Sequence, residues 1–271
     1  MDALDVRSEN MPHRKTIQID YQGKQWAISA KYNKLSDHWL VFLHGLGCSK
    51  ECFDYAYDTR LAKKYSILTF DFIGFGDSAK PNDFSYSLED HAAVAKLVID
   101  YFKPTDVVLV AHSMGGTIGV LLTQRLTNVV RLINVEGNLI SEDAGIVSRR
   151  TAEQTENEFK RHGFNRFLAN LKDSDEPAYR TWAGWYASSS KIAVYRSCCS
   201  LVEWSDNKEL LTFFNGLPKK AYIFGDRTDV ETLLPHLDHA NIISIPNGAH
   251  FMMLDNPEAF YAAVEEALEA D

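Results

Sequence analysis

The 271-residue sequence lacks any long hydrophobic run. Its longest apolar stretches have the length of a strand, far short of the ~20 residues that a membrane-spanning helix needs. The first residues, MDALDVRSENMPHRK, are polar and acidic, and they lack the basic start and apolar core of a secretory signal. We therefore expect a cytoplasmic protein with no membrane span.

Positive charge and cysteine are also scarce. The chain has 28 lysines and arginines against 37 aspartates and glutamates, a net charge of -9, which argues against nucleic acid as a partner. Its four cysteines include an adjacent pair, and the other two have no second pair at zinc-ligand spacing. We predict four free thiols, no metal and no cofactor, at Cys48, Cys52, Cys198 and Cys199.

What the sequence does have is an alternation of strand-like and helix-like segments. An alternating pair of runs around Gln22-Gly23 predicts a hairpin. Continuous apolar runs such as HWLVFL and VVLVA are typical of strands buried on both faces, and helical periodicity follows at 88–102 and 114–126. The pattern predicts an α/β fold: a mostly parallel, doubly wound sheet of about eight strands with helices on both faces.

The alternation stops between residues 138 and 217. This region has helical patterns, broken at Gly163, Pro177 and the serine run 188–190, and no strand pattern. We expect an all-helical lid, inserted into a core made of residues 15–137 and 218–271. Residues 1–14 are expected to form a flexible N-terminal arm.

Side chains with catalytic chemistry follow several predicted strands. Ser113 comes after VVLVA, Glu136 after RLINV, Asp226 and Asp229 after AYIF, and His250 after IISI. Ligand sites in open parallel sheets lie at the carboxyl ends of the strands, so we expect these residues to converge on one edge. A histidine that takes a proton from a serine while a carboxylate orients its ring is the arrangement of a nucleophilic hydrolase.

Four motifs occur in order along the chain: HGLG at 44–47, DFIGFGDS at 71–78, AHSMGG at 111–116 and NGAHFMMLDNPEAF at 247–260. With them the chain resembles the α/β-hydrolase fold superfamily, in particular serine hydrolases of the esterase/lipase type with a helical lid. Ala111 replaces the first glycine of the usual G-x-S-x-G turn. A small residue is all that this position requires.

The resemblance implies roles for particular residues. Ser113 is expected to be the nucleophile and His250 the general base. The backbone N–H groups of Leu46 and Met114 are expected to form the oxyanion hole. His44 and His112 lie inside motifs as packing or orienting residues.

The position of the catalytic acid departs from the usual pattern. Most relatives place it in a G-x-x-D sequence after the strand that precedes the histidine strand, and Thr228 stands at that place here. Some relatives, haloalkane dehalogenases among them, place the acid one strand earlier, where this chain has Glu136. We take Glu136 as the candidate, and Asp226 and Asp229 remain alternatives.

The predicted reaction is cleavage of a carboxylic ester, thioester or lactone through an acyl-enzyme on Ser113. Aromatic residues of the lid, Trp182, Trp185 and Tyr186, indicate a pocket for an apolar or aromatic acyl group, or else the lid's own core. Similar sequences hydrolyse carbon–carbon bonds or carry out cofactor-free perhydrolysis. A non-catalytic ligand-binding protein or receptor of the same fold is the alternative from another class. The sequence specifies neither the substrate nor the oligomeric state.

Overall fold

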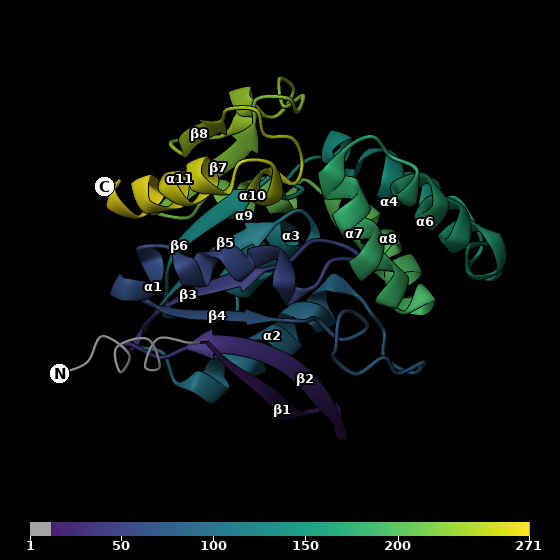
Figure 1. Ribbon diagram of the computed structural model, residues 1–271, viewed down its shortest axis with the longest axis horizontal. Coiled ribbons are helices and arrows are strands. Elements are labelled where there is room, and N and C mark those ends of the chain that lie inside the picture. The colour runs from purple at the N-terminus through teal and green to yellow at the C-terminus, as the bar shows by residue number, and fades with distance from the viewer. Residues whose placement is uncertain (1–11, 271) are drawn as a thin grey trace, which may run out of the picture.

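A computed structural model describes residues 12–270 of the chain (Figure 1). Its centre is an eight-stranded sheet with the strand order β1-β2-β4-β3-β5-β6-β7-β8. This confirms the predicted sheet. The strands are β1 (His13–Tyr21), β2 (Lys24–Asn33), β3 (His38–Leu43), β4 (Ser66–Phe70), β5 (Asp106–His112), β6 (Val129–Val135), β7 (Lys220–Gly225) and β8 (Asn241–Ile245).

The sheet is parallel except at one edge. Strands β1 and β2 form the predicted hairpin, β2 pairs antiparallel with β4, and all other neighbours are parallel. The arm predicted over residues 1–14 is too long at its end, because His13 and Arg14 already pair with Tyr32 and Lys31 in the hairpin. Residues 1–11 lie outside the described part of the chain.

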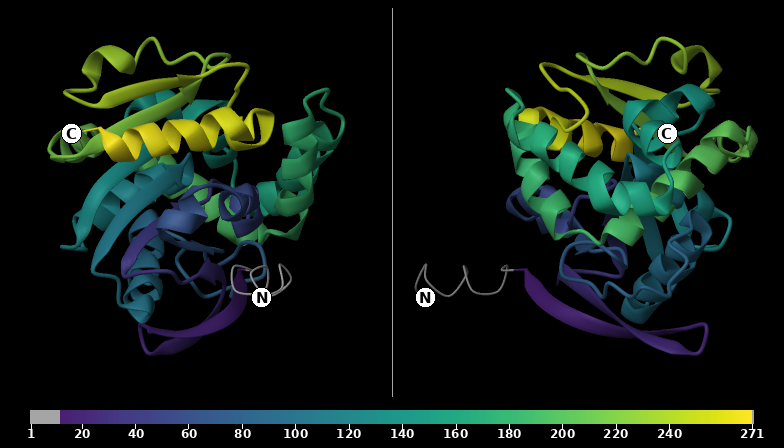
Figure 2. Two further views of the ribbon diagram at one scale, coloured as in Figure 1. Left: turned by 60° about the vertical axis from the view of Figure 1, so that its left-hand side comes forward. Right: turned by 90° about the vertical axis from the view of Figure 1, so that its right-hand side faces the viewer.

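Helices cover both faces of the sheet, as the alternating pattern predicted (Figures 1 and 2). Ser87 caps the first of the longer helices by accepting a hydrogen bond from the Asp90 N–H. Across residues 12–270, every helix is too short or too polar to cross a membrane. One face carries α2 (Leu88–Phe102), α3 (Met114–Thr123) and α9 (Glu209–Asn215), and the other carries η1 (Lys50–Asp58), α1 (Leu61–Lys64), α10 (Met252–Asp255) and α11 (Pro257–Glu269).

All elements between β6 and β7 are helical, and we call residues 138–217 the helical insertion. Its helices α4, α6, α7 and α8 gather beyond one end of the sheet (Figures 1 and 2). Pro177 begins α7, and Ser190 caps α8, so two of the predicted helix boundaries are confirmed. The elements before α9 are η2 (Ser141–Ala144), α4 (Gly145–Ala152), α5 (Glu156–Glu158), η3 (Phe159–Gly163), α6 (Phe164–Lys172), α7 (Pro177–Ser188) and α8 (Lys191–Asp206).

The predicted break at Gly163 is wrong. A π-helical turn, η3, runs through Gly163 and continues directly into α6. A Cβ atom at this position would lie 2.4 Å from Gln154 Oε1 and 2.8 Å from Phe159 Cδ2. The glycine therefore permits close packing against the preceding turn and does not end the helix.

Helix α8 fastens the insertion to the rest of the fold. The Ser200 hydroxyl accepts a hydrogen bond from the Leu88 N–H at 3.0 Å, and Ser197 Oγ lies 3.2 Å from His91 Nε2. The Ser190 N–H donates to the Gly74 carbonyl at 2.8 Å. The four cysteines are free thiols, as predicted.

Candidate active site

Ser113 occupies the turn between β5 and α3. Its φ of 54° and ψ of -123° lie in a region that L-residues rarely adopt, so the turn is strained. Two backbone hydrogen bonds stabilise this strained conformation. The Ser113 N–H donates to the Val135 carbonyl at 3.0 Å, and the Ser113 carbonyl accepts from the Gly116 N–H at 2.7 Å. The serine is thus fixed at the carboxyl end of a central strand.

The small residues around Ser113 allow strand and helix to approach. A Cβ atom at Gly115 would lie 2.4 Å from the Leu43 carbonyl oxygen, and backbone atoms of this kind cannot move aside. Ala111 fits because Gly119 faces it from α3, where a Cβ would come within 3.0 Å of the alanine methyl. The close approach requires glycine at 115, whereas alanine is accommodated at 111.

Two buried backbone N–H groups lie in the segments that meet at Ser113. A Cβ on Gly45 would be 3.1 Å from Ser113 Cβ, so the loop after β3 packs directly against the serine. The N–H of Leu46 in this loop and the N–H of Met114 at the start of α3 donate none of the hydrogen bonds between described residues. Buried backbone donors are almost always paired. Two unpaired ones beside a serine can hold a developing negative charge.

A hydrogen bond joins His250 to Glu136. His250 Nδ1 donates to Glu136 Oε2 at 2.7 Å, and Glu136 Oε1 accepts from the Gly225 N–H at 2.9 Å. The Glu136 side chain is only 4% exposed. Because Nδ1 carries the proton in this pair, Nε2 of the neutral ring is the basic nitrogen.

The two alternative acids lie elsewhere. Asp226 is exposed, and its backbone N–H donates to the Ile245 carbonyl at 3.0 Å. Asp229 is also exposed, and its carboxylate accepts from the Glu231 N–H at 3.1 Å. Among the described hydrogen bonds, neither carboxylate contacts His250. Of the three candidates, the structure brings only Glu136 to the histidine.

The two motif histidines orient the backbone around the site. His112 Nε2 donates to the His250 carbonyl at 2.8 Å, and burial lowers the pKa of His112 well below its ordinary value. His44 Nδ1 donates to the Gly45 carbonyl at 2.8 Å, while Nε2 accepts from the Phe72 N–H at 3.1 Å. Burial also lowers the pKa of His44. Both rings are neutral and hold loops in place.

Ser113, Glu136 and His250 line one cavity of about 380 Å³. Of the predicted pocket aromatics, Trp182 lines it and donates from Nε1 to the Leu46 carbonyl at 3.0 Å. Trp185 and Tyr186 do not line it, which corrects the prediction: Tyr186 is buried against Phe164 in the insertion's own core, with ring centroids 4.5 Å apart. Tyr179, another aromatic of the same helix, also lines it, and further apolar lining residues, which the prediction missed, include Val147, Leu201 and Phe251.

Comparison with known proteins identifies the family of the chain. Residues 40–263 match the family model described as "Alpha/beta hydrolase family". The chain belongs to this family. The match begins within β3, includes the helical insertion and ends in α11, so it leaves out only the first hairpin and the chain ends.

The curated relatives of this alpha/beta hydrolase match only part of it. "Probable lysophospholipase BODYGUARD 4" of Arabidopsis thaliana is 32% identical over 98 residues, which are 35% of this chain and 24% of the relative. "Putative esterase/lipase 2" of Mycoplasma genitalium is 31% identical over 85 residues, 31% of this chain and 32% of the relative. The matches thus span about a quarter to a third of the relatives' length.

Solved structures match the fold over nearly the whole chain. N-acyl homoserine lactonase AidH superposes with a TM-score of 0.75 at 16% identity, covering 94% of this chain and 96% of that one. The esterase EaEST of Exiguobacterium antarcticum gives a TM-score of 0.72 at 18% identity, covering 94% and 100%. At this identity the likeness shows the fold alone.

The DFIGFGDS motif of this alpha/beta hydrolase takes part in an ion-pair and hydrogen-bond network that holds its loop. The fully buried Lys50 ammonium lies 2.8 Å from Asp71 and 3.0 Å from Asp77. Asp71 also accepts hydrogen bonds from the backbone N–H groups of Lys50 at 2.7 Å and Asp77 at 2.8 Å. The network ties the loop after β4 to η1, which follows the HGLG segment.

Asp143 is a carboxylate of the cavity that sequence reasoning missed. Its Oδ2 accepts hydrogen bonds from the backbone N–H groups of Leu139 at 2.8 Å and Ile140 at 3.0 Å. Burial raises the pKa of Asp143 to about 6. No strand end or motif marks this residue in the sequence, because it lies in the irregular start of the insertion.

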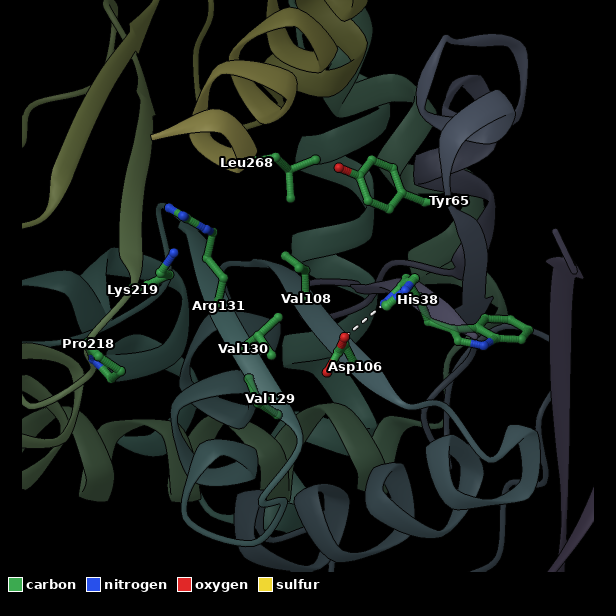
Figure 3. Close-up of a pocket in the computed structure, with 11 residues that line it drawn as sticks. His38, Tyr65, Asp106, Val108, Val129, Val130, Arg131, Pro218, Lys219 and Leu268 are labelled. Carbon is green, nitrogen blue, oxygen red and sulfur yellow. Dashed lines mark ion pairs between the residues drawn. The ribbon is translucent and has the colours of Figure 1, made fainter. Parts of the chain in front are cut away.

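A larger cavity, of about 550 Å³, lies at the other end of the strands from Ser113, where β3, β5 and β6 begin (Figure 3). Figure 3 shows His38 and Asp106 turned toward each other, with 2.8 Å between His38 Nδ1 and Asp106 Oδ2. Its lining residues include no serine, threonine or cysteine that could act as a nucleophile. The predicted nucleophile, Ser113, lines the smaller cavity.

Proposed function

We propose that the protein is a serine hydrolase that cleaves a carboxylic ester, thioester or lactone through an acyl-enzyme on Ser113. The observation that carries the proposal is the hydrogen bond between His250 and the buried Glu136, with 2.7 Å between Nδ1 and Oε2, in the cavity that also contains Ser113. A serine hydroxyl attacks an acyl carbon only when a positioned base removes its proton. The pair supplies that base in the required tautomer.

Each half-reaction uses groups of this chain. His250 Nε2 takes the proton of Ser113 Oγ as the oxygen bonds to the acyl carbon, and Glu136 stabilises the imidazolium without accepting the proton. The N–H groups of Leu46 and Met114 stabilise the oxyanion. Collapse of the tetrahedral intermediate releases the alcohol, which receives the proton from His250. A water molecule then repeats the sequence on the acyl-enzyme, and the acid leaves with Ser113 restored.

The helical insertion acts as a lid over residues 15–137 and 218–271 in this proposal. It contributes Val147, Tyr179 and Trp182 to the cavity, and so shapes the part that receives the acyl group. A space of about 380 Å³ with these apolar walls suits a small apolar or aromatic acyl group. The esterase, lipase and lysophospholipase names of the curated relatives support ester chemistry.

The test combines turnover with labelling. We expect hydrolysis of 4-nitrophenyl butyrate by the native chain, loss of that activity in Ser113→Ala, and labelling of Ser113 by a fluorophosphonate, located by mass spectrometry. Activity that persists in Ser113→Ala would assign the reaction to another group. A native chain that neither turns over esters nor takes up the label would leave a ligand-binding role in place of the hydrolase.

A further inference from the structure

A third concavity, of about 250 Å³, lies in the helical insertion and is lined by residues of α4, η3 and α6. Two arginines enter it from different helices, Arg150 from α4 and Arg166 from α6. No aspartate or glutamate lines it. The remaining lining residues are Val147, Thr151, Gln154, Phe159, Gly163, Phe167 and Asn170, so its polar groups are side-chain amides and a hydroxyl.

The two guanidinium groups have no acidic partner within residues 12–270. Two other arginines of the insertion are paired, Arg149 with Asp206 and Arg196 with Glu156 at 3.0 Å, whereas Arg161 has no ion pair among the described residues. Neither Arg150 nor Arg166 takes part in an ion pair or donates a side-chain hydrogen bond to a described residue. Both arginines are exposed and both line the same concavity, so their donors are available to an anion that enters it.

The concavity adjoins the catalytic cavity. Val147 lines both, and Phe167 of the concavity packs against Trp182 of the catalytic cavity with ring centroids 5.4 Å apart. The catalytic cavity itself contains the carboxylates of Glu136 and Asp143 and no lysine or arginine. The carboxylates of the catalytic cavity therefore disfavour the negative end of a substrate there, and the arginines of the neighbouring concavity favour it.

We propose that Arg150 and Arg166 bind the carboxylate or phosphate at the far end of a substrate whose ester bond lies at Ser113. The substrate class is then an ester with an apolar spacer and a terminal anion. This inference rests on the proposed ester hydrolysis. A planar guanidinium fork matches the two oxygens of a carboxylate or phosphate, so a pair of arginines selects this chemistry over a neutral end.

The experiment compares charged and neutral esters of equal length. Mono-(4-nitrophenyl) esters of dicarboxylic acids, from glutarate to sebacate, are measured beside the same compounds with a methyl-capped carboxylate. We expect the charged-to-neutral ratio of kcat/KM to peak at one spacer length. In the double variant Arg150→Gln, Arg166→Gln the ratio at that length should fall about tenfold. Arg161→Gln, an exposed arginine of the same insertion outside both cavities, should leave the ratio unchanged.

The outcomes separate the possibilities. A ratio that the double variant retains would overturn the inference while leaving ester hydrolysis intact. A free anion is the other source of this chemistry: if inorganic phosphate alters turnover of the neutral ester through these arginines, and no spacer length favours the charged ester, the substrate-end inference is wrong. If the native chain hydrolyses no ester, the proposed function fails. Calorimetric binding of the charged ester to Ser113→Ala, with and without the two arginines, then still tests the concavity.

Discussion

Replacing Glu136 by glutamine tests the choice of catalytic acid with almost no change of shape. The orientation of the new amide is set by the protein, because the Gly225 N–H, 2.9 Å from Oε1, needs an acceptor. The amide oxygen therefore stays at Gly225, and the NH₂ group faces His250 Nδ1 at the position where Oε2 lies 2.7 Å away. Two donors cannot face each other, so Nδ1 must give up its proton.

The imidazole then carries its proton on Nε2, the nitrogen needed as the base. Loss of the acid in this way lowers kcat by about 10⁴ in comparable triads, or about 5.4 kcal/mol of activation free energy. We expect this loss for Glu136→Gln with 4-nitrophenyl butyrate, with Tm within about 4 °C of the native value. Asp226→Asn and Asp229→Asn are the matched controls, and both should stay within about twofold of the native rate.

A folded Glu136→Gln protein with more than a tenth of native kcat would refute this reasoning. So would an equal loss in Asp226→Asn, since that carboxylate is exposed and makes no described contact with His250. Glu136→Asp separates geometry from charge: a carboxylate shorter by one methylene cannot reach both Gly225 and His250. We expect its kcat to fall between those of the native and glutamine proteins.

Three further predictions follow from single contacts. Gly115→Ala places a Cβ 2.4 Å from a backbone carbonyl, so it should lower the free energy of unfolding by at least about 3 kcal/mol in urea titration; a change below about 1 kcal/mol would contradict the packing argument. Trp182→Phe leaves the buried Leu46 carbonyl without its 3.0 Å donor and should lower kcat about tenfold, whereas Trp185→Phe should not. Burial raises the pKa of Asp143 to about 6, so its charge destabilises the fold above that pH, and the penalty disappears as pH falls toward about 4. Asp143→Asn should therefore raise Tm by about 3 °C at pH 8 and by much less at pH 4; an equal gain at both would refute the sign.

Much of the candidate site could be predicted because its residues follow strands. A continuous apolar run fixes where a strand ends, and parallel strands bring those ends to one edge. Strand ends pointed to Ser113, His250 and three carboxylates, and the resemblance to relatives with an earlier acid favoured Glu136; the structure brings Ser113, His250 and Glu136 to one cavity. The role of each in catalysis remains a prediction.

The cavity walls were harder to predict, because they come from helices whose orientation depends on distant contacts. Trp182, Trp185 and Tyr186 lie within five residues on α7, and the sequence does not show which of them faces the sheet. Contacts with the loop after β3 determine how α7 is oriented. The Leu46 carbonyl accepts a hydrogen bond from the Trp182 side chain, and the absence of a side chain at Gly47 leaves room for Tyr186. Asp143 was missed for the same reason, since its burial depends on tertiary packing.

The order of the strands explains how a carboxylate after β6, in place of one after β7, can contact His250. Strands β6 and β7 are neighbours, and the Glu136 carboxylate from the end of β6 reaches the N–H of Gly225, the last residue of β7. Backbone pairing continues past the end of β6, where the Glu136 N–H donates to the Ile223 carbonyl at 3.1 Å and fixes a strained φ of 44°. The carboxylate therefore lies at the junction of the two strands. An acid from either strand can occupy this place while His250 stays where it is, which is why Thr228 can stand at the usual position of the acid without loss of the histidine's partner.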